Sequence, residues 1–301
     1  MQNNSTPQAK FLRNLSPDVK ASLTIREDGP GLRHLIGHIS IIVLLGGGIA
    51  ARINIWPLLL LPYGILVTFL FTLSHECTHR TPFLMRWINE VVGHAIAPIL
   101  ALPFVWFRHF HAAHHRFTND PEKDPELIAG GRPKSWKEFI RYLTGWGYWC
   151  GQARVLWTNA FCEINASYIP RGRHTSIRRE ALAILLFYTI VGFSIPWPLL
   201  LRMWIIPVVI GQPFLRVYLL AEHGMCPQVT SMFENTRTTY TSWIIRAMAW
   251  NMPYHAEHHF MPSVPFHKLP ALNCLVAGRL RSTSNGYVGF LRQYINSLSN
   301  R

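Results

Sequence analysis

Residues 55–74 read IWPLLLLPYGILVTFLFTLS and contain no charged side chain. About 20 apolar residues in a helix cross the hydrocarbon core of a bilayer. Residues 181–201 also lack charge, residues 203–221 contain a single Arg216, and residues 35–51 form a weaker apolar run. A helix satisfies all of its own backbone hydrogen bonds within lipid. The sequence therefore predicts an all-α integral membrane protein with about four transmembrane helices.

The basic residues are distributed unevenly around two predicted hairpins, residues 35–74 and residues 181–221. Of the 29 Lys and Arg residues, fourteen lie in the connection 75–180, five precede residue 35 and seven follow residue 223. Basic residues collect on the cytoplasmic side of membrane proteins. We therefore expect both termini to be cytoplasmic, with the connection folded as a helical cytoplasmic cap on the membrane.

A protein with a formal net charge of +14 could bind either nucleic acid or anionic lipid. Because the charge flanks apolar spans, the lipid bilayer is the expected partner, and nucleic acid is not. The first 33 residues are polar and mixed in charge, which is unlike a cleavable signal peptide. We predict an N-terminal cytoplasmic tail, residues 1–33, and one membrane domain, residues 34–301. The five scattered cysteines are expected to be free thiols in a reducing compartment.

Residues 75–79 read HECTH and fit the HExxH pattern, which on a helix is typical of zinc metalloproteases. In such a protease His75 and His79 would bind zinc, and Glu76 would activate water. Histidines at positions i and i+4 share a helix face in any protein. The pattern therefore indicates a metal more firmly than it indicates a reaction.

Two further histidine clusters, HAAHH at residues 111–115 and HAEHH at residues 255–259, share the form HxxHH. On a helix, each cluster can direct three imidazoles to one place. The three clusters together contain eight histidines: His75, His79, His111, His114, His115, His255, His258 and His259. One zinc ion binds at most four such ligands, so this number favours a site with two metal ions. All three clusters follow predicted spans or lie in cytoplasmic segments, so they can meet at one membrane face.

Four other residues are weaker candidates. His223, in LLAEHG at the end of the last span, is either a ninth potential metal ligand or a capping or surface residue at the helix end. Three further residues could orient the ligand histidines without binding the metal themselves: Asn251, Asp120 and Asp124. Alternatively, these three are turn residues beside prolines. The remaining histidines do not cluster and are expected to be structural or exposed: His34, His38, His94, His109, His174 and His267.

HECTH, HAAHH and HAEHH, together with the paired spans, resemble the three histidine boxes of the membrane fatty acid desaturase and hydroxylase superfamily, over about residues 40–270. The resemblance implies a non-haem centre of two iron ions, Fe²⁺ or Fe³⁺, with dioxygen as co-substrate. Such a centre removes hydrogen from an unactivated C–H bond and gives a double bond or a hydroxyl group. The eight box histidines match one by one, and His223 is similar to an additional histidine of the superfamily.

Residues 235–270 look most like a bacterial branch of the superfamily that is labelled fatty acid desaturase, which implies a bacterial inner membrane enzyme. A fatty acyl lipid is the leading substrate, and a lipid headgroup or a small amino-acid-derived metabolite is the alternative. Each turnover needs two electrons. Because the sequence has no dinucleotide motif and no iron–sulfur spacing, we expect a separate ferredoxin- or cytochrome-like donor with its reductase. The basic face would bind an acidic donor.

Two other classes of protein share part of this pattern, namely zinc proteases and metal transporters or sensors. An intramembrane zinc protease needs a third ligand, typically an aspartate from a later span, and the sequence has no aspartate after Asp124. Zinc is also inert in the redox step that C–H cleavage requires. A metal transporter or sensor would place its ligands near the bilayer midplane, whereas these clusters lie at the ends of the spans. Both classes are therefore disfavoured.

Overall fold

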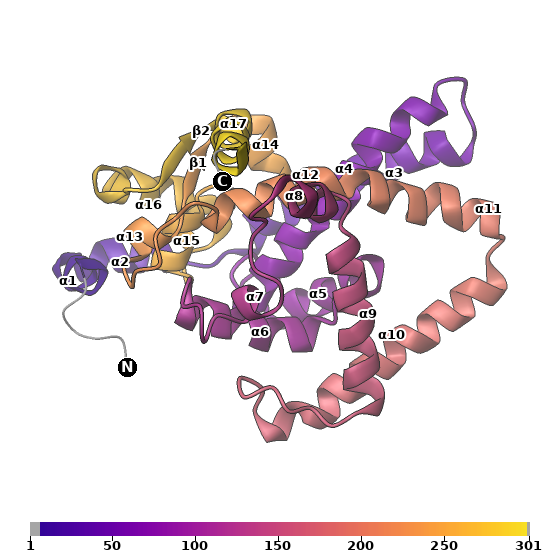
Figure 1. Ribbon diagram of the computed structural model, residues 1–301, viewed down its shortest axis with the longest axis horizontal. Coiled ribbons are helices and arrows are strands. Elements are labelled where there is room, and N and C mark those ends of the chain that lie inside the picture. Colours follow the sequence, from indigo (N-terminus) through magenta and orange to yellow (C-terminus); the bar gives the residue numbers. More distant parts are fainter. Residues whose placement is uncertain (1–6, 300–301) are drawn as a thin grey trace.

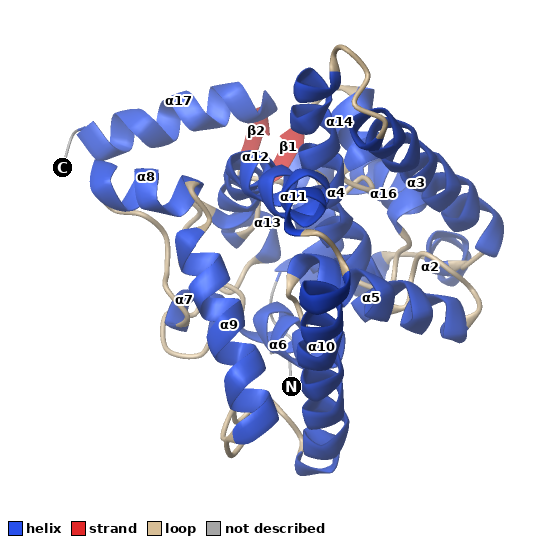
Figure 2. Cartoon of the chain, turned by 90° about the vertical axis from the view of Figure 1, so that its right-hand side faces the viewer, coloured by secondary structure: helices blue, strands red, loops and turns tan. Residues whose placement is uncertain are grey.

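The computed structural model describes residues 7–299, which are almost entirely helical (Figures 1 and 2). The elements are, in chain order, α1 (Pro7–Asn14), α2 (Pro17–Thr24), α3 (Asp28–Ala50), α4 (Trp56–His79), α5 (Arg86–Leu100), α6 (Phe104–Phe117), α7 (Pro125–Ile128), α8 (Trp136–Leu143), α9 (Trp146–Phe161), η1 (Arg171–Arg173), α10 (His174–Ser194), α11 (Trp197–Leu200), η2 (Leu201–Ile205), α12 (Ile206–His223), α13 (Met232–Asn235), β1 (Thr238–Tyr240), α14 (Trp243–Met248), α15 (His255–Phe260), η3 (Phe266–Lys268), α16 (Leu269–Val276), η4 (Ala277–Arg279), β2 (Thr283–Asn285) and α17 (Gly286–Ser299). The all-α prediction is confirmed apart from β1 and β2, which pair as two short parallel strands.

Three helical segments of the described chain are long and apolar enough to cross a membrane: Pro17–Ala50, Trp56–His79 and Trp197–His223. They contain three of the four predicted spans. By length and composition, a fourth candidate arises if α5 and α6, which meet at a bend of 97°, count as one broken span. The described chain thus has three to four candidate spans, and their arrangement in two hairpins stays a prediction.

The prediction of one continuous span over residues 181–201 was wrong. Helix α10 ends at Ser194, and Ile195 takes an extended conformation. Pro196 follows, and a residue that precedes proline is disfavoured in the helical conformation. The segment from Trp197 onward instead joins α12 through the π-helical turn η2, so one 27-residue helix ends at His223.

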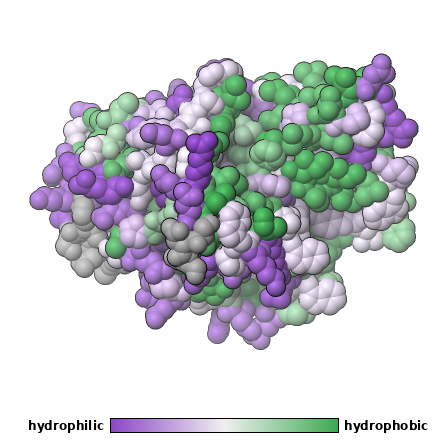
Figure 3. Space-filling view, turned by 45° about the horizontal axis from the view of Figure 1, so that its top comes forward, coloured by the Kyte–Doolittle hydropathy of each residue, from purple (hydrophilic) through white to green (hydrophobic). Residues whose placement is uncertain are grey.

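Apolar and hydrophilic side chains gather on different parts of the surface. In Figure 3, apolar residues cover much of the side where Figure 1 places α11 and the turn between α3 and α4, and hydrophilic residues dominate the opposite side. Leu44, Leu58 and Phe193 belong to the exposed apolar residues, and Phe193 is 91% exposed. So large an exposed apolar surface is typical of contact with lipid.

Helices α4 and α12 pack closely because two glycines lie between them. A Cβ atom added to Gly64 would lie 2.2 Å from Pro207 O, and one added to Gly211 would lie 2.2 Å from Gly64 O. Small residues at such a crossing let two membrane helices approach closely. The contact matters for the site because α4 ends at His79 and α12 ends at His223.

Helix α6 is fixed by a side chain from α10. Pro103 precedes α6 and makes no side-chain cap, but Glu180 accepts hydrogen bonds from Phe104 N (2.9 Å) and Val105 N (2.8 Å). Unpaired N–H groups at a helix N-terminus attract an anion through hydrogen bonds and the helix dipole. Glu180 therefore determines where α6 begins and helps to position the clustered histidines of this helix, His111, His114 and His115.

The N-terminal helices pack on the rest of the molecule. Leu23 of α2 is 4% exposed and belongs to the main core, and the ring of Phe11 in α1 contacts that of Phe260 at a centroid distance of 5.7 Å. The boundary predicted between residues 33 and 34 falls inside α3, and the division into a tail and a domain stays a prediction. All five cysteines are free, as expected.

Candidate metal centre

Nine histidine side chains converge at one place from four helices. They lie in the last turn of α4, along α6, at the end of α12 and along α15. Their potential ligand atoms form two groups, and within each group these atoms lie within 4.8 Å of one another. The first group contains His75, His79, His111, His115 and His258, and the second contains His114, His223, His255 and His259.

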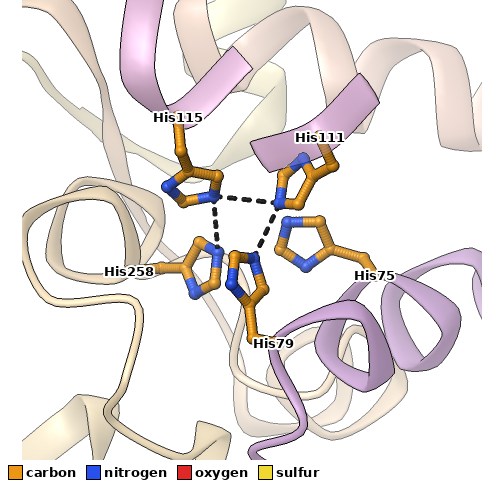
Figure 4. A group of neighbouring side chains, drawn as sticks. All are labelled: His75, His79, His111, His115 and His258. Carbon is orange, nitrogen blue, oxygen red and sulfur yellow. Dashed lines mark hydrogen bonds between the residues drawn. The ribbon is translucent and has the colours of Figure 1, made fainter. Parts of the chain in front are cut away.

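The first group is a ring of imidazoles whose Nε2 atoms face one another (Figure 4). The Nε2 atom of His111 lies 2.8 Å from that of His79 and 2.9 Å from that of His115. His258 Nε2 lies 3.1 Å from His115 Nε2. His75 completes the group, and its buried Nε2 has no hydrogen-bond partner among the described residues.

These short contacts fit metal ligands better than hydrogen bonds. An imidazole nitrogen has either one proton or one lone pair in the ring plane. His111 and His115 each make two Nε2 contacts, so neither can satisfy both of them as ordinary hydrogen bonds. Two nitrogens that bind one ion at about 2.1 Å and at right angles are about 3 Å apart. A cation among the lone pairs accounts for the spacing.

The second group repeats this arrangement with four histidines. His223 Nε2 lies 3.1 Å from His114 Nε2 and 3.3 Å from His255 Nε2. The Nε2 atom of His259 is buried and has no partner among the described residues. All four residues are buried, which excludes bulk water from the group.

The structure divides each HxxHH cluster between the two groups, which differs from the expectation that each cluster directs three imidazoles to one place. On α6, His111 and His115 face the first group while His114 faces the second. On α15, His258 faces the first group while His255 and His259 face the second. Positions i and i+4 of a helix stay together, and position i+3 is rotated enough to reach the neighbouring group.

Carboxylates lie behind several of the rings. Asp124 Oδ1 lies 2.9 Å from His114 Nδ1, Glu222 Oε1 lies 3.2 Å from His255 Nδ1, and Glu76 Oε1 lies 3.5 Å from His258 Nδ1. Of these three contacts, the one between Asp124 and His114 has the geometry of a hydrogen bond. A carboxylate bonded at Nδ1 holds the proton there and leaves Nε2 as the lone-pair donor, as is usual for histidines that bind metal. Glu76 therefore lies behind a ring, and it is not placed as the general base of a protease.

Burial keeps the histidines of α15 in the form that binds metal. Loss of hydration, together with the neighbouring histidines, lowers the pKa of His255, His258 and His259 well below the ordinary histidine value. Neutral imidazole has a free lone pair, and imidazolium has none. These three side chains are therefore neutral and able to bind a metal at physiological pH.

Helix α15 is held in place by a buried acid. Glu257 Oε2 accepts a hydrogen bond of 2.5 Å from Thr238 Oγ1 on β1, and Glu257 Oε1 accepts one from Asn273 on α16. Burial raises the pKa of the Glu257 carboxyl group. A short helix of six residues has little stability of its own, so these bonds to β1 and α16 help to orient the third histidine cluster.

Of the three residues predicted to support the ligands, Asp124 contacts a histidine and two do not. Asp120 accepts hydrogen bonds from Glu122 N and Lys123 Nζ in a surface turn. Asn251 lies in a left-handed turn and donates to Phe266 O. Neither forms a hydrogen bond to the two histidine groups within the described chain, which matches their alternative reading as turn residues.

Sequence reasoning missed Glu222 and Thr118. Thr118 Oγ1 lies 3.1 Å from His259 Nδ1, and Glu222 lies behind His255. Glu222 did have a signal in the sequence, because an acidic residue at the end of an apolar span is costly unless it has a role. Thr118 had none, since a threonine at a helix end is common.

A helical molecule with membrane-length spans that brings nine histidines together beside the ends of α4 and α12 has the arrangement expected of a membrane protein with a metal site. The chain belongs to the fatty acid desaturase family, whose model matches residues 52–288. Membership makes the protein an oxidoreductase and an integral membrane protein. The resemblance seen in the three histidine clusters is thereby confirmed.

Two bacterial relatives illustrate the range of the family. The chain is 24% identical over 263 residues to the sn-1 oleoyl-lipid 12-desaturase of Anabaena variabilis, covering 76% of this chain and 71% of the relative. It is 30% identical over 236 residues to the dihydrorhizobitoxine desaturase of Bradyrhizobium elkanii, covering 70% of this chain and 65% of the relative. The chain thus spans less than two thirds of the second relative's length.

Proposed function

We propose that the protein is a di-iron oxygenase that introduces a double bond into a fatty acyl lipid, with hydroxylation at the same position as the other outcome. The observation that carries this proposal is the pair of buried histidine groups with facing Nε2 atoms. In the desaturation, the substrate loses two hydrogen atoms from neighbouring carbons. Dioxygen takes up these two hydrogens with two electrons and two protons from outside, and two water molecules form.

The donor set supports two iron ions. Five imidazoles in the first group and four in the second exceed what one tetrahedral ion can bind. Imidazole suits iron, and a redox-active metal is required for C–H cleavage. With iron bound, the centre would supply the oxidant for that step. The first group would be held from α4, α6 and α15, and the second from α6, α12 and α15.

The chain itself contributes orientation and shielding. Asp124 fixes the ring of His114 through a hydrogen bond, and Glu222 and Glu76 lie near the Nδ1 atoms of His255 and His258. The rings of Phe71 and Phe107 stack on His75 and His111, respectively. Such apolar walls exclude water and protect both the oxidant and the substrate radical from side reactions.

The proposal includes an orientation in the membrane and an electron donor. We infer that the histidine centre and both termini face the cytoplasm of a bacterial cell, because the basic connection 75–180 lies on that side by the positive-inside rule. The same basic surface suits an acidic ferredoxin- or cytochrome-like donor that is served by a reductase.

A small metabolite is a second candidate substrate for the same chemistry. It is favoured by the 30% identity to a relative that is named for dihydrorhizobitoxine and not for a lipid. Lipid and small-molecule extracts should therefore both be examined.

The proposal is tested by purifying the protein in detergent and measuring metal per chain, with His258→Ala as the variant. We expect about two irons per chain for a two-metal site. Expressing cells grown under oxygen should contain an oxidised lipid or metabolite that the variant lacks. Labelled dioxygen separates the outcomes, since a hydroxylated product retains one labelled oxygen atom and an alkene retains none.

His109→Ala is the matched control, because His109 lies on α6 but belongs to neither histidine group. It should retain the iron and the product. A single zinc per chain with unchanged extracts would refute the proposal. Metal accumulation without any oxygen-dependent product would favour transport or sensing instead.

A further inference from the structure

A cavity of about 1120 Å³ adjoins the second histidine group. Its wall includes His223 and Glu222 from α12, and aromatic residues such as Trp106 and Phe110 from α6. The volume is in the range of pockets that bind small molecules or larger ligands. A ligand in this cavity would therefore lie against both the proposed metal centre and apolar side chains.

The wall also contains Arg216, a basic residue within a membrane-length helix. Only 8% of its surface is exposed. An ionisable side chain inside a membrane span is costly, and it usually faces a partner or a functional cavity. Apolar packing alone therefore does not explain why a charged side chain is buried at position 216.

Two tyrosines hold the Arg216 side chain in place. Its guanidinium carbon lies 4.7 Å from the centroid of the Tyr148 ring and 5.9 Å from that of Tyr142. Tyr148 donates a hydrogen bond to Leu100 O, and Tyr142 donates one to Arg216 O, so both rings are anchored. Stacking on an aromatic ring leaves the N–H groups in the guanidinium plane available for other partners.

Two nitrogen atoms of the guanidinium group, Nε and Nη2, are buried without a hydrogen-bond acceptor within the described chain. The carboxylates of Glu126 and Glu222 also line the cavity, and they interact with Arg216 at longer range than a hydrogen bond. The Nε and Nη2 atoms lie on the same edge of the guanidinium group, which is the edge that a carboxylate or phosphate bridges with two hydrogen bonds. Gln152 is a second polar group of the cavity wall, and its buried Oε1 also lacks a partner.

The position of Arg216 relates it directly to the proposed centre. It precedes His223 by seven residues on α12, which is two helical turns, so both side chains share a face about 10 Å apart along the axis. A ligand bound at Arg216 would extend along this face toward the second histidine group.

We infer that Arg216 binds an anionic group, a carboxylate or a phosphate, of the molecule whose C–H bond is oxidised. The anionic group sits on the Nε and Nη2 edge, and the carbon that is oxidised lies beyond it, near His223. The role of the bound molecule as a substrate rests on the proposed function, whereas the anion site rests on the cavity and the two guanidinium nitrogens without an acceptor. Arg216 is a binding residue and takes no part in the chemistry.

The test measures binding of three probes of equal chain length to the iron-loaded protein in a neutral detergent. Decanoate carries a carboxylate, decyl phosphate carries a phosphate, and decanol carries neither. We expect at least one anionic probe to bind more tightly than decanol by a factor of about a hundred or more, as two charge-assisted hydrogen bonds would give. The better of the two anions identifies whether a free acid or a phosphate headgroup is recognised.

Arg216→Gln should abolish that preference and leave decanol binding unchanged. Arg202→Gln is the matched control, since Arg202 lies in the preceding turn η2 and outside the cavity wall. Iron content and the thermal unfolding midpoint verify that each variant is folded. If Arg216→Gln does not fold, the comparison of the three probes on the unaltered protein still tests whether the cavity prefers an anion.

Equal binding of the anionic probes and decanol by the unaltered protein would overturn the inference. An unchanged preference in Arg216→Gln would overturn it as well. If the anion preference fails while iron and an oxidised product are found, only the anion site is refuted. If decanoate binds through Arg216 but the protein holds zinc and forms no product, only the proposed function is refuted.

Discussion

The Nδ1 atom of His114 lies 2.9 Å from Oδ1 of Asp124, and both side chains are fully or almost fully buried. The second carboxylate oxygen, Oδ2, accepts a hydrogen bond of 2.8 Å from Asn119 N. Asp124 therefore ties the ring of a proposed ligand to the loop that follows α6, and it fixes which nitrogen of His114 carries the proton.

We predict that Asp124→Asn weakens metal binding in the second group about 10- to 100-fold, the range seen when such supporting residues are lost. The amide keeps the size of the side chain but removes its charge. Anaerobic titration with Fe²⁺ would measure the affinity of each ion. Asp120→Asn is the control, because Asp120 lies in the same loop and its side chain accepts hydrogen bonds from Glu122 and Lys123 instead of a histidine. Equal affinities in the two variants would contradict the assignment.

Adjacent residues on α15 should affect different ions. His258 belongs to the first group and His259 to the second. We expect His258→Ala and His259→Ala each to lower the iron content, with the remaining iron in a different environment in each variant. Mössbauer spectra of samples enriched in the iron-57 isotope would show this difference. Identical residual spectra would mean that the two groups are not separate sites.

Gly211→Ala should destabilise the protein. The added Cβ would lie 2.2 Å from Gly64 O, so α4 and α12 would have to separate. Overpacking of this kind costs about 1–3 kcal/mol. Because His79 and His223 end the two helices, iron binding should weaken as well. Thermal unfolding in detergent measures the first effect and iron titration the second.

The control for this variant is Gly192→Ala, a glycine inside α10 with no heavy atom within 4 Å of an added Cβ. Alanine is favoured over glycine by up to about 1 kcal/mol in a helix, so this change should leave the stability unchanged or slightly raised. A similar loss in both variants would show that the α4–α12 contact is not the cause.

Glu180→Gln should loosen α6. The substitution leaves one oxygen acceptor where the carboxylate offers two, to Phe104 N and Val105 N, and it removes the charge that faces the helix dipole. Loss of a helix cap costs about 0.5–2 kcal/mol. Hydrogen exchange of the first turn of α6 should become faster, and iron should bind more weakly. Glu163→Gln changes an exposed acid and should have neither effect.

The sequence was sufficient to predict the helical membrane class and all nine clustered histidines, because both depend on local patterns. Apolar runs of helix length identify spans, and HxxH and HxxHH spacings identify shared helix faces. The assignment of His114 to one group and of its neighbour His115 to the other could not be predicted. It depends on how α6 is rotated against α4 and α12, and helical spacing alone does not determine that rotation.

Two differences between the sequence expectations and the structure have physical causes of the same kind. The run of apolar residues up to residue 201 suggested one span, but Pro196 ends the helical conformation at Ile195 in spite of the uniform hydrophobicity. Asn251 was considered a ligand support because it lies four residues before His255, yet the chain between them turns instead of continuing a helix. The number of residues between two positions predicts their distance in space only where the backbone between them is a regular helix or strand.

The division of each cluster between the two groups also has a consequence for biosynthesis. Both groups include histidines of α15, so a nascent chain that ends before residue 255 has neither ligand set complete. Before residue 255 the first group has four of its five histidines, whereas the second has two of its four, so the complete pair of groups forms only after α15 has been synthesised. The order of residues along the chain thus delays completion of both histidine groups until the last candidate span, Trp197–His223, has been made.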